Sequence, residues 1–540
     1  MRGNQITSKQ NLNIELPRPY FPQKRSILGI GAGILVIGLL AISLFFAPEA
    51  AVYGLAGIGI GLPLLLLVWF RPEFGLLAVV FLAMSLIRAD IIDLRLPIGG
   101  LELRDLVLIG MLGLLILQGL IHTNLTIPWW HVGAPLLVFL GLAFVSTVYA
   151  LFFQHVKPSY VFSELRALIF YSVFFVTGWA ITNRRQLETA LAGLFILADL
   201  LAGVIILQQF LGVNHPLFAA MSYNNWSLYE VQQTGGAGGF GTVRIMPPGV
   251  VLIYFMIILA LCLIVFTPHN WRLRNIFVLQ LVFLSFGLLL TYTRALWIAT
   301  VCALGFVLLA LLPTYKAHFI RYFIIGLPLL CLLFGLMGTI SVQSISGSPM
   351  ATAFVERVLS IVTPEETLGS DSLQWRIFET EQGLRSVSEN PLVGVGLGNS
   401  YRAITTLQGE ARGIRTGYSL AAGKISSLTR FLHNSYLFIA VKMGLPALAC
   451  FLWFCAALVV KSGQLYRNLS EGQSRGIVLA VLASFVGLML WSVLHQHFVQ
   501  TESTAIVGLM AGLAASLRRR SDGQNDLLQP SHRASARPHS

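Results

Sequence analysis

The feature that most constrains this chain is its succession of apolar runs, many of them near the ~20 residues that cross ~30 Å of hydrocarbon as a helix. Only 11% of the 540 residues are charged and 56% are hydrophobic. The mean hydropathy is +0.76. Soluble domains usually carry about 25% charged residues. The sequence therefore excludes a soluble globular protein and predicts an all-α polytopic membrane protein.

The apolar runs fall into two groups by length and by the polar sequence between them. Eight long runs cover residues 27–46, 50–70, 132–153, 187–211, 246–267, 322–338, 434–460 and 501–517. Six runs that are shorter or less clearly separated cover residues 74–87, 106–121, 165–182, 276–292, 295–312 and 476–494. Together they predict about 12–14 transmembrane helices, with 14 as the count that includes every run.

Lysine and arginine, which accumulate on cytoplasmic flanks, predict the orientation. Both tails are basic, with Arg2, Lys9, Arg18, Lys24 and Arg25 at one end and Arg518, Arg519, Arg520, Arg533 and Arg537 at the other. Both termini are therefore expected in the cytoplasm, which requires an even number of helices. The net charge of +13 fits this topology and attraction to anionic lipid head groups, and we expect no nucleic-acid partner.

The same reading divides the chain into five segments. They are a cytoplasmic tail (1–26), a bundle of about 11 helices (27–338), a large extracytoplasmic loop (339–433), the C-terminal membrane helices (434–517) and a disordered cytoplasmic tail (518–540). The loop is polar and electrically balanced. It contains a predicted helix that begins near Leu373 and ends before Asn390, because proline at 391 disfavours helical geometry in the residue before it.

Candidate functional residues stand at the helix ends that this topology places outside. Arg294 has scarcely four polar residues around it, and burying a cation near the bilayer centre costs about 2.5 to 3.5 kcal/mol, so it either snorkels or has an anionic partner. Arg244 precedes a helix start, and His433 opens another. The glycines at Gly394 and Gly396 allow close approach of a phosphate or sugar, or form a tight turn.

These elements, in this order, resemble the O-antigen ligase and O-antigen polymerase-like membrane glycosyltransferases. The resemblance rests on Thr291-Tyr292-Thr293-Arg294, on the Arg376 helix that leads into Asn390-Pro391-Leu392-Val393-Gly394-Val395-Gly396-Leu397-Gly398, and on His433-Asn434-Ser435-Tyr436. It covers residues 276 to 450 most strongly. The resemblance implies a GT-C-like enzyme in the cytoplasmic membrane of a bacterium. Such an enzyme moves a glycan from a polyprenyl diphosphate to a lipid, glycan or protein acceptor at the outer face.

Each candidate residue then has an expected role. Fixed positive charge from Arg244, Arg294 and Arg376 would hold the diphosphate, and His433 would take a proton from the acceptor. Substrate contacts are also expected from the set Gly394, Gly396 and Asn434. No cofactor and no metal are expected, because the sequence lacks a grouped set of acidic and histidine ligands. Two alternatives remain: a transporter of a small anion such as bicarbonate, and a non-catalytic docking loop.

Overall fold

The computed structural model divides into two units, residues 1–67 and residues 68–540. The structure describes residues 68–86, 102–121, 129–211, 215–218, 245–267, 271–311, 371–402, 429–470 and 472–528, with a few positions between 315 and 324. All of these belong to the second unit. The predicted N-terminal tail and the predicted helix at 27–46 lie outside the described residues, as do nearly all residues of the predicted helices at 50–70 and 322–338.

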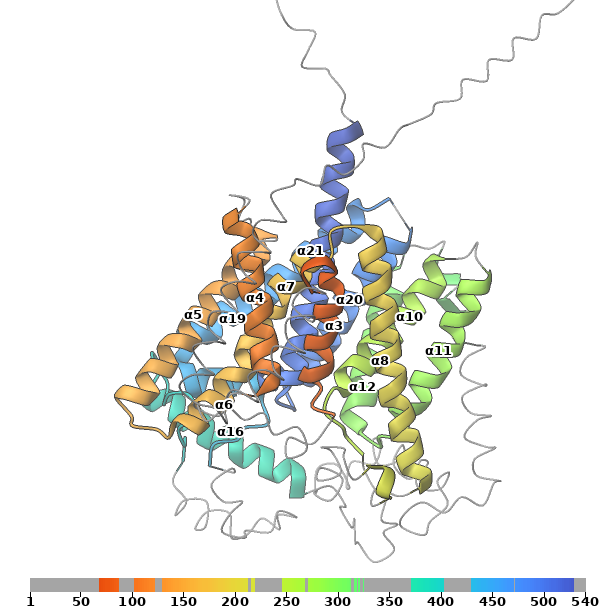
Figure 1. Cartoon of the computed structure of the whole chain (residues 1–540). Helices are drawn as coiled ribbons and strands as arrows, with labels where there is room; N and C mark the ends of the chain where they lie inside the picture. The colour runs from red at the N-terminus through yellow and green to blue at the C-terminus, as the bar shows by residue number, and fades with distance from the viewer. Residues whose placement is uncertain are drawn as a thin grey trace, which may run out of the picture. The chain divides into compact units, whose positions relative to one another are not determined.

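The described part of the chain consists of helices and contains no strand (Figure 1). Seven of the described helices are long and apolar enough to cross a membrane. They are α4 (Leu103–Ile121), α5 (Trp130–Phe152), the continuous α6, η1 and α7 (Pro158–Ala180), α8 (Arg184–Leu211), α11 (Trp271–Leu289), α19 (Ser435–Asn468) and α20 (Gly472–Trp491). The prediction of an all-α polytopic membrane protein is confirmed. The total of 12–14 spans stays a prediction.

Three shorter apolar helices and one long C-terminal helix complete the described bundle. They are α3 (Pro72–Ala83), α10 (Val250–Phe266), α12 (Arg294–Ala310) and α21 (Thr501–Leu528). Every residue of α10 is buried, as expected for a helix that is apolar on all sides and lies at the centre of a bundle. By contrast, α4 and α11 expose large side chains such as Leu120 and Leu279, which suits helices that face lipid.

The last helix continues beyond the predicted membrane segment. Residues 518–540 were expected to form a disordered tail, whereas α21 extends to Leu528. The residues from Arg518 to Leu528 include no proline, and Pro530 is the first residue after them that cannot continue a helix. The helix therefore continues for several turns into the polar sequence.

The starts of α19 and α12 and the end of α20 lie at the same end of the bundle. We call it the α16 end, after α16 (Asp371–Glu389), which lies across it in Figure 1. There the Ser435 amide donates to the Ser492 carbonyl at 3.0 Å, which joins the start of α19 to the end of α20. At the opposite end, the Tyr466 hydroxyl of α19 donates to the Ala310 carbonyl at 3.4 Å. The start of α12, at Arg294, therefore also lies at the α16 end.

A glycine-rich segment after α16 packs against a kink in α19. The kink is at Gly444, whose φ of 81° is left-handed. Beside it, the Val395 and Gly396 amides donate to the Val441 and Lys442 carbonyls at 2.8 and 3.0 Å. The Lys442 ammonium is fully buried and donates to Glu164 at 2.9 Å, and the second Glu164 oxygen accepts from the Gly398 amide at 2.6 Å. These contacts fix the segment that follows α16.

Replacing Gly394 by alanine is expected to destabilise the protein by about 1 to 3 kcal/mol. Its φ is +69°, and an added Cβ would lie 2.5 Å from the Val441 carbonyl oxygen. The matched control is Gly463→Ala on the same α19, where an added Cβ meets nothing within 4 Å. Thermal unfolding in detergent should show a lower midpoint for the first variant only. Equal midpoints would contradict the packing role.

Candidate active site

A cleft of about 340 Å³ opens at the α16 end, between α16 and the first turn of α19. Its polar lining includes Arg376, Glu379, His433 and Asn434, and Leu437 from α19 contributes apolar surface. Val493 and Leu494, which follow α20, extend the apolar side. The volume lies within the range of about 300 to 1,000 Å³ that is usual for small-ligand sites. The cleft therefore combines charged groups with an apolar wall.

His433 is held in this cleft by a buried carboxylate. Its Nδ1 lies 2.6 Å from Oε2 of Glu379, and the His433 backbone amide donates to the same oxygen at 3.3 Å. The other carboxylate oxygen accepts from the indole of Trp375 at 2.8 Å. Glu379 is only 1% exposed, whereas the His433 side chain keeps 14% exposure toward the cleft. One carboxylate oxygen thus holds the imidazole, and the other is itself held by the indole.

This geometry determines which imidazole nitrogen is suited to accept a proton. A carboxylate accepts hydrogen bonds, so the short contact assigns the proton to Nδ1 of His433. The opposite nitrogen, Nε2, is then the one with a lone pair. A carboxylate in this position also stabilises the imidazolium that forms after proton transfer. The pair has the arrangement of a general base with an orienting carboxylate.

Arg376 reaches the same cleft because of its spacing on α16. It lies three residues before Glu379, and side chains at i and i+3 share a face of a helix. Its side chain is half-buried. The structure therefore brings together two of the three residues that the sequence predicted as catalytic, Arg376 and His433.

Asn434 has a clear local task at the start of α19. Its side-chain oxygen accepts from the Tyr436 and Leu437 amides at 2.9 and 3.0 Å, which is an N-cap. With Asn434 as its N-cap, α19 begins at Ser435, and His433 therefore lies just before the first turn of this helix. Asn434 was predicted to bind substrate. It does line the cleft, and substrate contact remains a prediction.

Arg294 begins α12, which packs against α20. An added Cβ on Gly487 would meet the Ala299 carbonyl at 2.9 Å. From this contact, α12 extends five residues to Arg294 and α20 extends four residues to its last residue, Trp491. At 1.5 Å rise per residue, Arg294 is about level with Ser492. The latter accepts the hydrogen bond from Ser435, two residues after His433. Arg294 and His433 therefore both lie at the α16 end of the bundle.

Two buried residues support the Glu379 side of the cleft. The Arg402 guanidinium lies 5.1 Å from the ring centre of Trp375 and 5.3 Å from that of Phe378. Burial lowers the pKa of Arg402, opposed by neighbouring Tyr401 and Glu379. Burial also raises the pKa of Tyr401 far above its usual value. Arginine remains protonated nonetheless, so its cation stacks on the indole that holds Glu379.

The remaining predicted residues do not gather in the cleft. Gly394 and Gly396 face protein: an added Cβ would meet the backbone of α19 at the first and Ala150 of α5 at the second. Their shape serves close packing, and substrate contact by them stays untested. Arg244 lies outside the described residues, which resume at Ile245.

Sequence analysis did not single out Glu379. The spacing could have indicated it, because Glu379 follows Trp375 by four residues and Arg376 by three, which places all three on one face of the predicted helix. The pairing joins residues 54 apart in sequence, across a part of the loop whose path the sequence does not specify.

The fold and the cleft together define a multi-pass membrane protein with a histidine–carboxylate pair at one end of its helices. A comparison with protein families gives a match between the O-antigen ligase family and residues 279–452. The resemblance predicted from the sequence is confirmed over this segment, which contains Arg294, Arg376, Glu379 and His433. At the level of the family, the match supports an O-antigen ligase-like or polymerase-like function. No curated protein matches the chain.

Proposed function

We propose that this protein is a glycosyltransferase that moves a glycan from a polyprenyl diphosphate to an acceptor at the outer face of the cytoplasmic membrane. The observation that carries the proposal is the His433–Glu379 pair in a cleft shared with Arg376, inside the segment that matches the family. A base oriented by a carboxylate suits deprotonation of a hydroxyl or amine. The adjacent guanidinium suits an anionic donor.

The proposed reaction is a single displacement. The acceptor O–H or N–H loses its proton to Nε2 of His433, and the acceptor atom forms a bond to the anomeric carbon. The bond between that carbon and the diphosphate oxygen breaks, and its electron pair leaves with the polyprenyl diphosphate. Attack from the face opposite the leaving group inverts the anomeric centre. Glu379 holds the imidazole and stabilises its charged form throughout.

The donor needs fixed positive charge more than it needs activation. A diphosphate is already a good leaving group, and arginine binds phosphate oxygens through two parallel N–H groups. Arg376 in the cleft and Arg294 beside the end of α20 are proposed to hold it, with Arg244 as a third member. These cations remain charged at any working pH, so we propose that the reaction requires no divalent metal.

The site also fits a substrate that arrives from lipid. Leu437, Val493 and Leu494 form the apolar wall of the cleft, and the last two are 46% exposed. A polyprenyl chain would lie against apolar surface of this kind while its diphosphate meets the arginines. The acceptor, whether lipid core, growing polysaccharide or protein, would approach from the aqueous side. We propose cytoplasmic termini and a bacterial inner-membrane location, in line with the basic tails.

The test is reconstitution of the full chain in lipid with a polyprenyl-diphosphate oligosaccharide and candidate acceptors. We expect a product of reduced gel mobility, release of polyprenyl diphosphate in equal amount, and the same rate with and without EDTA. A rate that falls on chelation and returns with added Mg²⁺ or Mn²⁺ would overturn the metal-free mechanism. Absence of transfer together with bicarbonate flux into the same vesicles would favour the transporter alternative.

A further inference from the structure

The proposed role of His433 requires an ionised Glu379. Only a carboxylate accepts from Nδ1 of the imidazole and so leaves the lone pair on Nε2. Glu379 is nevertheless only 1% exposed. Its hydrogen-bond partners are the His433 ring and backbone amide and the Trp375 indole, and none of these is charged while His433 is a base. Because burial among neutral groups favours the protonated carboxyl, a nearby positive charge is needed to keep Glu379 ionised.

Arg402 provides a positive charge that is buried beside Trp375. The residue is only 6% exposed, and its guanidinium lies 5.1 Å from the ring centre of Trp375, 5.3 Å from that of Phe378 and 5.0 Å from that of Tyr401. Trp375 is also the residue whose indole N–H donates to Glu379 at 2.8 Å. One indole therefore contacts the cation with the face of its ring and the carboxylate with its N–H.

The segment that carries Arg402 is fixed against the segment that leads to His433. The Tyr401 amide donates to the Thr429 carbonyl at 3.1 Å, and the hydroxyl oxygens of Ser400 and Thr429 lie 3.1 Å apart. Thr429 precedes His433 by four residues. The cation and the imidazole are thus carried by two loop segments that are joined to each other.

Packing alone does not account for an arginine at this position. An apolar side chain would fill the space among three aromatic rings without the free-energy cost of burying a cation. Burial lowers the pKa of Arg402, and Tyr401 and Glu379 oppose that effect. By the same attraction, the guanidinium favours the ionised form of Glu379.

We propose that Arg402 is a positioning residue: its charge keeps Glu379 ionised, and the carboxylate in turn keeps Nε2 of His433 ready to accept a proton. Unlike Arg376, Arg402 does not line the cleft, so it acts through Glu379 and not on a substrate. The inference rests on the proposed glycosyl transfer, because the proton that Nε2 takes is the one that the acceptor loses.

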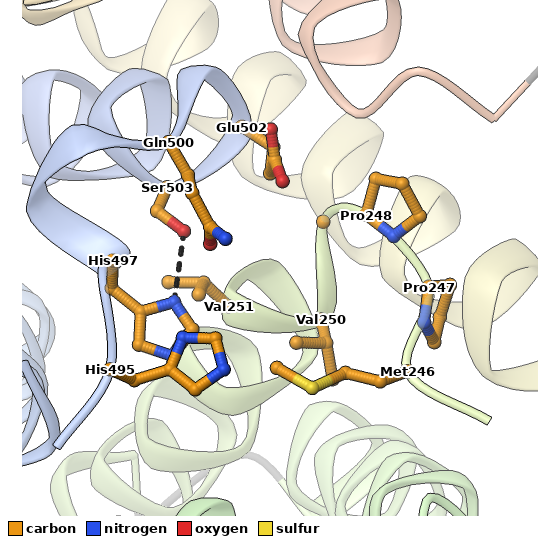
Figure 2. A pocket seen from close by; sticks show the side chains of 11 residues that line it. Met246, Pro247, Pro248, Val250, Val251, His495, His497, Gln500, Glu502 and Ser503 are labelled. Atoms are coloured by element: carbon orange, nitrogen blue, oxygen red, sulfur yellow. Dashed lines mark hydrogen bonds between the residues drawn. The ribbon is translucent and has the colours of Figure 1, made fainter. Parts of the chain in front are cut away.

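Other titratable groups around the pair stay the same in every variant compared below. The ring centre of His495, which follows α20, lies 6.4 Å from that of His433. His495 lines a second cavity of about 20 Å³, shown in Figure 2, where its ring stacks on that of His497 at 4.4 Å. The remaining groups are Arg376 and Glu381 in the cleft, Tyr401 beside Arg402, and Glu502 in the second cavity. A pH profile that changes only when the charge at position 402 is lost is therefore assigned to that charge.

The test is the pH dependence of transfer by the reconstituted full chain in Arg402→Met. Without the cation, the His433–Glu379 pair takes up a proton more readily, so the fall of the rate on the acid side should begin at a pH higher by about one unit. On that part of the profile the rate should be about tenfold below wild type, and it should recover as the pH rises. Arg402→Lys keeps the charge and should keep the wild-type profile. Arg385→Met removes an exposed arginine from the same α16 and should change neither rate nor profile.

The charge of His433 provides a second measurement that does not depend on catalysis. In the full chain with isotope-labelled histidine, the magnetic resonance signal that disappears in His433→Gln belongs to this imidazole and reports its protonation. Its titration should move to higher pH in Arg402→Met and should not move in Arg385→Met. Arg402→Gln is the second neutral variant if the methionine variant does not fold.

The outcomes separate this inference from the function on which it rests. An unchanged rate and an unchanged His433 titration in the neutral variants would overturn the role of Arg402 and leave the transferase intact. A loss of rate that is equal at every pH, shared by Arg402→Lys and accompanied by a lower unfolding temperature, would also overturn it, because that pattern assigns Arg402 to packing. A shifted His433 titration without any transfer by the wild-type protein would support the effect of Arg402 on the pair and refute the proposed glycosyl transfer.

Discussion

The substitution His433→Gln is expected to slow glycan transfer by about 10² to 10⁴-fold, the usual contribution of a well-placed general base. The imidazole Nε2 is the proposed proton acceptor, and an amide cannot take up a proton at neutral pH. Because His433 is not among the arginines proposed to hold the diphosphate, binding of the lipid donor should change little. Single-turnover transfer and donor binding, measured on the same reconstituted sample, distinguish the two effects.

Glu379 provides the graded control for this result. In Glu379→Gln the amide can donate to Nδ1 of His433, which favours the wrong tautomer, so a loss of similar order is expected with His433 itself intact. Glu381, two residues later on α16, also lines the cleft but is exposed. Glu381→Gln should therefore transfer at close to the wild-type rate. Equal losses of rate in both glutamate variants would show that the negative charge of the loop, and not the pairing of Glu379 with His433, determines the rate of transfer.

Much of the architecture could be predicted because lipid imposes a simple rule. A span must be about 20 apolar residues of helix, and each of the seven described helices that could cross a membrane contains an apolar run that the sequence shows. Local rules were equally informative in the loop. The proline at 391 marked the end of α16, and an asparagine before an apolar run is a common N-cap, which Asn434 proves to be.

Contacts between distant segments could not be read in the same way. The pairing of Glu379 with His433 depends on how α16 lies across the bundle. From the sequence, Gly394 and Gly396 could form a tight turn or contact a ligand. The structure shows that the α19 backbone at Val441 fills the space beside Gly394. The buried ion pair of Lys442 with Glu164 likewise could not be predicted from sequence periodicity, because the two residues lie 278 positions apart.

Arg294→Ala is expected to lower transfer by about 10² to 10³-fold, the effect of removing one preorganised group that stabilises developing charge. Arg294 is the first residue of α12. A cation in the first turn of a helix is opposed by the helix dipole, which favours anions there by about 0.3 to 1 kcal/mol. With a diphosphate bound, the guanidinium and the helix N-terminus would act on it together. Lysine at this position keeps the charge but loses the two-pronged geometry, so an intermediate rate is expected.

Stability provides the measurement that separates this role from a structural one. If Arg294 is retained for the anion, then Arg294→Ala should unfold at or above the wild-type temperature while transfer and donor binding both fall. Arg272→Ala is the matched control, since Arg272 is exposed, stacks on Trp271 at 5.7 Å and lies at the opposite end of α11 from the turn that leads to Arg294. It should leave transfer unchanged. A lower unfolding temperature for Arg294→Ala with normal donor affinity would assign the arginine to the fold, because a residue kept for the diphosphate cannot lose its charge without weakening the donor complex.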